Sequence, residues 1–124
     1  MREKRVLVID DEVVFTQTVQ SGLERTGKYV VRIENNGALA VQAAKEFEPD
    51  IIFLDIVMPE MCGDDVAIEL QKYTETKYIP IVFLTAIVTK EEVDDSGSVI
   101  GSHPFLAKPV TLNQIIESID RNTH

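Results

Sequence analysis

The sequence predicts an α/β fold in which helices cover both faces of a doubly wound, five-stranded parallel sheet. Short apolar runs alternate along the chain with longer segments whose apolar residues recur at helical spacing, five times over. The most apolar runs, at residues 6–9, 51–54 and 79–84, are typical of central strands buried on both faces. Strands joined by helices pair in parallel through right-handed crossovers.

The first half of the chain predicts two strand–helix units. The strand at residues 6–9 leads into a helix that Gly27 ends. The apolar stripe expected to face the core consists of Val14, Phe15, Val19 and Leu23. Polar residues interrupt the second strand, at residues 29–34, so we expect it at an edge of the sheet. An Ala-rich helix over residues 39–47 follows and is stopped by Pro49.

The middle of the chain predicts two further units. A strand ends at Asp55, and a helix follows over residues 64–73. The strand at residues 79–84 precedes a Ser/Thr-x-x-Glu capping box at residues 89–92, which predicts the start of a fourth helix. We expect that helix to be short because Gly and Ser residues follow it closely.

The last unit is a brief strand at residues 105–107 and a final helix. Pro104 precedes the strand, which favours a position away from the centre of the sheet. A capping box at residues 111–114 predicts the helix start. The residues expected to face inward are Leu112, Ile115, Ile116 and Ile119.

Composition limits the functions open to the chain. Its 124 residues suit one domain spanning residues 1–124, and 44% hydrophobic content suits a globular core. A net charge of −9 disfavours direct nucleic-acid binding. Cys62 is the single cysteine, which rules out an internal disulfide and fits a reducing cytoplasm. We find no apolar stretch long enough for a signal peptide or membrane span and expect a cytoplasmic protein.

Polar residues follow four of the five predicted strands. Asp10 and Asp11 follow the first, Asp55 ends the third, Thr85 ends the fourth, and Lys108 follows the fifth. The carboxyl ends of parallel strands share one edge of a sheet, where ligands bind in such folds. Three converging carboxylates repel one another unless a cation intervenes, and Mg²⁺ favours carboxylate oxygens. Asp55, alone on a central strand, is the best candidate nucleophile for phosphoryl transfer.

Each of these residues also has a purely structural interpretation. Asp10 and Asp11 can serve as a helix cap and a first-turn acid, and Asp55 can begin a solvated turn. Thr85 can bond to backbone, and Lys108 can be an ordinary surface lysine. Because such residues follow four strands that end at the same edge of the sheet, we favour the functional interpretation over four separate structural ones.

The same residues match the pattern of a known protein family. In order and spacing, the chain resembles the receiver domain of two-component response regulators over its whole length. The residues that carry the resemblance are Asp10-Asp11, Asp55, Met58-Pro59, Gly63, Thr85-Ala86 and Lys108-Pro109. The resemblance implies the flavodoxin-like or CheY-like strand order 2-1-3-4-5. It also implies a cis peptide bond between Lys108 and Pro109.

The resemblance assigns roles to individual residues as well. It implies that Asp55 accepts the phosphoryl group, while Thr85 and Lys108 engage it. Mg²⁺ is the implied cofactor, held by Asp10, Asp11 and Asp55 together with the main-chain carbonyl of Val57. Phe105, three residues before the lysine, occupies the position of a switch residue. It can equally be a plain core residue, and the sequence leaves that choice open.

Two stretches depart from the family pattern. Residues 97–104 differ from the usual Gly-Ala motif before the fifth strand, which puts the fourth helix and the output face beside it in question. The side chains two positions beyond Asp55 and Thr85 are apolar, Val57 and Ile87. Neither can orient an attacking water, so we hypothesise that they slow hydrolysis of the acyl phosphate.

The sequence therefore favours a phosphorylation-controlled signalling switch rather than an enzyme with a separate substrate. Expected partners are a sensor histidine kinase or histidine phosphotransfer protein, and a downstream protein target or an output domain outside this chain. A phosphorylation-dependent homodimer stays open, as does a receiver-like interaction module that is never phosphorylated. An aspartate-nucleophile phosphatase fits poorly because such enzymes carry an Asp-x-Asp motif after the first strand, which Asp10-Asp11 is not. A flavin module fits poorly because the negative charges of Asp10-Asp11-Glu12 would repel its phosphate.

Overall fold

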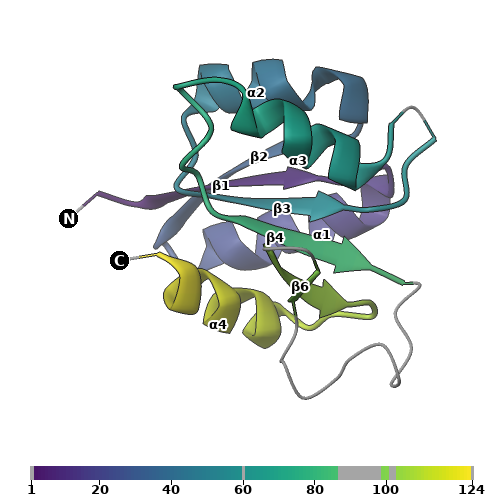
Figure 1. Ribbon diagram of the computed structural model, residues 1–124. Helices are drawn as coiled ribbons and strands as arrows, with labels where there is room; N and C mark the ends of the chain where they lie inside the picture. Colours follow the sequence, from purple (N-terminus) through teal and green to yellow (C-terminus); the bar gives the residue numbers. More distant parts are fainter. Residues whose placement is uncertain (1, 60, 87–98, 101–102, 124) are drawn as a thin grey trace.

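A computed structural model describes residues 2–59, 61–86, 99–100 and 103–123. Figure 1 shows its strands and helices along the chain. They are β1 (Lys4–Ile9), α1 (Val13–Arg25), β2 (Tyr29–Glu34), a 3-10 turn η1 (Gly37–Leu39), α2 (Ala40–Phe47), β3 (Ile51–Asp55), α3 (Gly63–Gln71), β4 (Ile81–Thr85), β5 (Val99–Ile100), β6 (His103–Ala107) and α4 (Leu112–Asn122).

The predicted sheet is present, with one addition. Its strand order is β2-β1-β3-β4-β6-β5, and β2, β1, β3, β4 and β6 run parallel. With β6 as the fifth parallel strand, this is the expected order 2-1-3-4-5. The two-residue β5 pairs antiparallel with β6 and was not predicted. It falls in the stretch that departs from the family pattern. The helix expected to begin near residue 89 lies outside the described residues.

Helices cover both faces of the sheet, as predicted (Figure 1). On one face, α2 and α3 pack small and aliphatic side chains such as Ala44 and Leu70 against β1, β3 and β4. On the other face, α1 and α4 contribute Leu23 and Ile119 to a second cluster. The strands β3 and β4 are buried over their whole length, and β1 is buried from Val6 to Ile9. Burial on both faces explains why these strands are continuous apolar runs.

The expected inward stripe of α1 is partly wrong. Val19 and Leu23 are buried and Phe15 is half-buried, but Val14 is 78% exposed. Thr16 is buried instead, and its hydroxyl donates to the carbonyl of Val13 and accepts from Asn35. A threonine with satisfied hydrogen bonds can take a core position, so apolar character alone misjudged the face of the helix.

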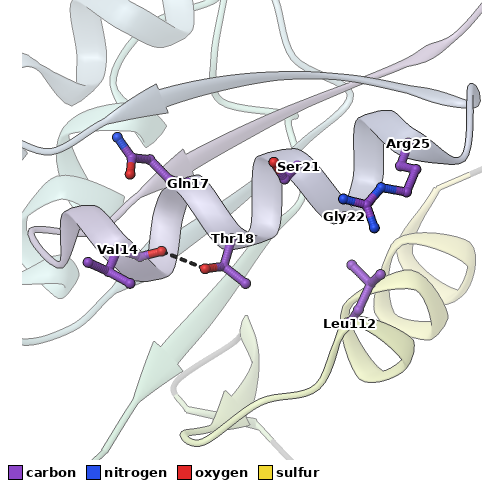
Figure 2. Close-up of a pocket in the computed structure, with 7 residues that line it drawn as sticks. All are labelled: Val14, Gln17, Thr18, Ser21, Gly22, Arg25 and Leu112. Carbon is purple, nitrogen blue, oxygen red and sulfur yellow. Dashed lines mark hydrogen bonds between the residues drawn. The ribbon is translucent and has the colours of Figure 1, made fainter.

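The inward face of α4 is also partly wrong. Ile115 and Ile119 are buried, while Ile116 is half-buried and Leu112 is 37% exposed. Leu112 packs over Gly22 of α1, where an added Cβ atom would lie 2.9 Å from it, and both residues line a pocket together with Val14 (Figure 2). The capping box of α4 is confirmed, with Thr111 and Gln114 each bonding the other's backbone N–H. No helix in the described ranges is long and apolar enough to cross a membrane.

Candidate functional site

The strand register brings the predicted site residues to one edge of the sheet. Ile9 pairs with Leu54, Asp55 with Leu84, and Thr85 with Ala107. The ladder continues one step further because the Lys108 N–H donates to the Thr85 carbonyl at 2.8 Å. The peptide bond between Lys108 and Pro109 is cis, as expected.

Three carboxylates converge at this edge. Asp10, Asp11 and Asp55 each place one oxygen within 4.8 Å of the others. Asp10 is fully buried, Asp55 is 5% exposed, and Asp11 is the most accessible of the three. Backbone donors orient two of them: the Glu12 N–H donates to Asp10 Oδ1 at 2.9 Å, and the Val57 N–H donates to Asp55 Oδ1 at 3.2 Å. The cluster is thus built into the ends of β1 and β3.

Lys108 supplies the positive charge beside this cluster. Its Nζ lies 2.7 Å from Asp10 Oδ2 and 3.8 Å from Asp55 Oδ2. It also donates to Glu12 Oε1 at 2.6 Å. Its side chain is only 12% exposed, so these contacts are made in a partly desolvated setting. Lys108 is therefore a member of the site and not an ordinary surface lysine.

Crowding and burial perturb the acids. Burial, followed by the charge of Asp10, raises the pKa of Asp55 to about 7, although Lys108 and the Val57 N–H act in the opposite direction. Burial likewise raises the pKa of Asp10, against the lowering influence of Lys108. Burial alone would lower the pKa of Lys108, but contacts with Asp10 and Glu12 raise it overall. The site therefore holds its negative charge at a cost in free energy.

A divalent cation would offset the repulsion between these buried carboxylates, and the arrangement of their oxygens fits such an ion. Asp10 Oδ2 is buried and, within the described part of the chain, receives no well-aligned hydrogen bond, its contact with Lys108 being an ion pair. Carboxylate oxygens gathered in this way match the ligand preference of a hard cation. Asp10, Asp11 and Asp55 can hold such an ion.

Two further predicted residues lie at or under the site. Thr85 is buried at the end of β4, next to Asp55 in the sheet. Phe105 is 3% exposed and belongs to the core cluster beneath α2 and α3. The structure thus places Phe105 inside the core. Val57, by contrast, is 55% exposed just beyond Asp55, and Ile87 lies outside the described residues.

Some residues that shape the site were given no structural role in the sequence analysis. Glu12 had been noted only for its charge, yet it binds Lys108 directly. Asn35 donates to the Asp10 carbonyl at 2.7 Å and ties β2 to the loop that carries the acids. Gly63 packs so closely that a Cβ atom would clash with the Asp55 carbonyl oxygen. Of these three residues, only Gly63 could have been singled out from the sequence, because a glycine that follows a strand-end acid indicates a close approach of the backbone.

Comparisons with known proteins show which family this chain is similar to. The family model described as the response regulator receiver domain matches residues 6–120. Protein PilH of Pseudomonas aeruginosa is 32% identical over 118 residues, covering 94% of this chain and 94% of PilH. The solved structure of chemotaxis protein CheY4 of Vibrio cholerae is similar with a TM-score of 0.83 and 26% identity, over 98% of this chain and 99% of CheY4.

Another relative is longer than this chain. The probable transcriptional regulatory protein TcrX of Mycobacterium tuberculosis is 32% identical over 90% of this chain, a match that covers 46% of TcrX. Similar sequences therefore occur both as nearly whole proteins and as parts of longer ones.

Proposed function

The chain belongs to the response regulator receiver domain family, whose members are phosphoacceptors in two-component signalling, and from this premise we propose that Asp55 is the residue that accepts the phosphoryl group. The observation that carries the proposal is the convergence, at one edge of the sheet, of the buried Asp55 with two further carboxylates and the Lys108 ammonium. Phosphoryl transfer requires a nucleophile in line and positive charge around the phosphoryl oxygens.

Asp55 acts as the nucleophile. One carboxylate oxygen attacks the phosphorus of the donor, the phosphorus–nitrogen bond of a phosphohistidine breaks, and the imidazole leaves and takes up a proton. The attacking carboxylate must be ionised, whereas burial raises the pKa of Asp55 to about 7. Asp10, Asp11, Asp55 and the Val57 carbonyl would hold a Mg²⁺ ion, whose positive charge would favour the ionised carboxylate and the phosphoryl oxygens.

Two side chains would then hold the product. Lys108, 3.8 Å from Asp55 Oδ2, is near enough to pair with a phosphoryl oxygen on Asp55. The Thr85 hydroxyl, at the end of the neighbouring strand, can donate a hydrogen bond to a second phosphoryl oxygen. We assign Phe105 the role of switch residue, and its side chain already lies in the inward position, buried beneath α2 and α3.

The output of this chemistry is a change in partner binding. We propose that residues 1–124 form one receiver domain and that it has no separate substrate, promoting only its own phosphorylation and dephosphorylation. A histidine kinase or phosphotransfer protein donates the phosphoryl group, in the cytoplasm where ATP-dependent kinases act. A downstream protein, or an output domain outside this chain, then recognises the phosphorylated form.

The test is phosphorylation by acetyl phosphate, followed by intact mass. We expect the unaltered protein to gain one phosphoryl group in Mg²⁺ and none in EDTA. The Asp55→Asn variant should gain none, and Lys108→Met should gain it more slowly. A matched control, Glu117→Gln, removes a carboxylate from the exposed side of α4 and should behave as the unaltered protein. Equal labelling of Asp55→Asn would refute the assignment of Asp55.

A further inference from the structure

The ion pair between Lys108 and Glu12 has no part in the chemistry proposed above. Lys108 Nζ donates to Glu12 Oε1 at 2.6 Å and lies 2.7 Å from Asp10 Oδ2. Glu12 thus accepts a hydrogen bond from the ammonium, and Asp10 forms an ion pair with it. Asp55 Oδ2, at 3.8 Å, is beyond hydrogen-bond distance. The lysine thus binds two acids more closely than the residue that reacts.

The surroundings of Lys108 favour this outer position. A hollow beside the ammonium is lined by Glu12, Phe15, Ala86, Lys108, Pro109 and Val110. The Phe15 ring centroid lies 4.8 Å from Lys108 Nζ, within the range of a cation–π contact. Glu12 and Phe15, at and just after the start of α1, therefore both attract the ammonium toward the rim of the site.

The Glu12 side chain is available for this task alone. Glu12 is the N-cap residue of α1, yet its side chain makes no capping hydrogen bond. Its backbone makes the local contacts, with the N–H donating to Asp10 and the carbonyl accepting from Thr16. A substitution that alters the carboxylate therefore leaves the backbone of the loop in place.

We propose that Glu12 is a positioning residue that restrains Lys108 in the unphosphorylated protein and thereby sets the rate at which Asp55 is phosphorylated. The contact with Glu12 holds the ammonium 3.8 Å from Asp55 Oδ2, and loss of that contact frees it to move closer to a phosphoryl oxygen on Asp55. Because Glu12 is 61% exposed, solvent screens the pair, and the restraint is moderate. This inference rests on the proposed phosphorylation of Asp55.

Two variants separate restraint from simple charge. Glu12→Gln removes the charge but keeps the length of the side chain. Glu12→Asp keeps the charge but withdraws the carboxylate by about 1.5 Å, the length of one carbon–carbon bond. An aspartate at this N-cap position can also bond to first-turn N–H groups, which turns it further from Lys108. If Glu12 acts by reaching Lys108, both variants should release the lysine.

The experiment measures the initial rate of phosphorylation by acetyl phosphate in saturating Mg²⁺, read by intact mass. We expect both variants to react faster than the unaltered protein by roughly two- to five-fold, the range open to a largely exposed ion pair. Glu117→Gln serves as the control for a lost surface charge and should not change the rate. Affinity for beryllofluoride, followed by ¹⁹F NMR as a stand-in for the bound phosphoryl group, should rise by a similar factor in both variants.

Other results overturn the inference in different ways. If Glu12→Asp matches the unaltered protein while Glu12→Gln reacts faster, Glu12 acts only through its charge. Unchanged or slower rates in both variants would show that Glu12 does not restrain Lys108. If the unaltered protein gains no phosphoryl group, the proposed function fails first, and that outcome is distinct from a labelled protein whose variants show no difference.

Discussion

Asp55→Asn should stabilise the folded protein at pH 8 when no divalent cation is present. Asparagine has the shape of aspartate and can still accept the hydrogen bond that the Val57 N–H donates. The substitution removes only the negative charge, which burial and the charge of Asp10 disfavour. The residue proposed to carry the chemistry is thus expected to weaken the fold that contains it.

The sign and size of the effect follow from the pKa. Burial raises the pKa of Asp55 from 3.8 to about 7, so the folded protein holds this proton more tightly than the unfolded chain does. Stability is therefore lost as the pH rises from about 4 through about 7. At about 1.4 kcal/mol for each tenfold change, the charged group costs at most about 4 kcal/mol at pH 8, and less than half of that at pH 5.

Urea denaturation followed by circular dichroism, in EDTA at both pH values, measures this directly. We expect Asp55→Asn to gain about 2–4 kcal/mol in the free energy of unfolding at pH 8 and less than half of that at pH 5. Adding Mg²⁺ should narrow the gap, because the ion binds the unaltered site better and stabilises it. Glu117→Gln should change little at either pH. A gain that does not depend on pH, or no gain at pH 8, would refute the reasoning.

Three further substitutions test other parts of the structure. Gly63→Ala should cost about 1–3 kcal/mol in urea denaturation, because its Cβ would meet the Asp55 carbonyl oxygen; an unchanged midpoint would mean that the loop yields freely. Thr111→Ala should cost about 1 kcal/mol through loss of the capping box of α4, and a neutral result would contradict that role. Val57→Asn should shorten the lifetime of the phosphorylated protein after the donor is removed, since an amide beside Asp55 can orient water; an unchanged decay rate would count against this idea.

The strand ends were predictable from the sequence because a parallel sheet leaves them little freedom. Once residues 6–9, 51–55 and 105–107 are strands of one parallel sheet, Asp10, Asp55 and Lys108 must meet at one edge. The apolar character of these runs sufficed to identify the strands, and the register then placed the side chains.

Side-chain details were less predictable. Glu12 and Lys108 are 96 residues apart, and their contact depends on how two long side chains turn at the rim of the site. Val14 fits a helical apolar pattern, yet Thr16 occupies the buried position because Asn35 satisfies its hydroxyl. Patterns of polarity do not register such hydrogen bonds. The antiparallel β5 is two residues long, too short to produce a strand pattern of its own.

The central claim is that Asp55 itself carries the phosphoryl group. Borohydride reduces an aspartyl phosphate to homoserine and leaves unmodified aspartate unchanged, so it marks the reacted residue permanently. After incubation with acetyl phosphate and Mg²⁺, reduction and peptide mass mapping should find homoserine at position 55. Homoserine at Asp10 or Asp11 instead, or no homoserine in a protein that had gained a phosphoryl group, would contradict the claim.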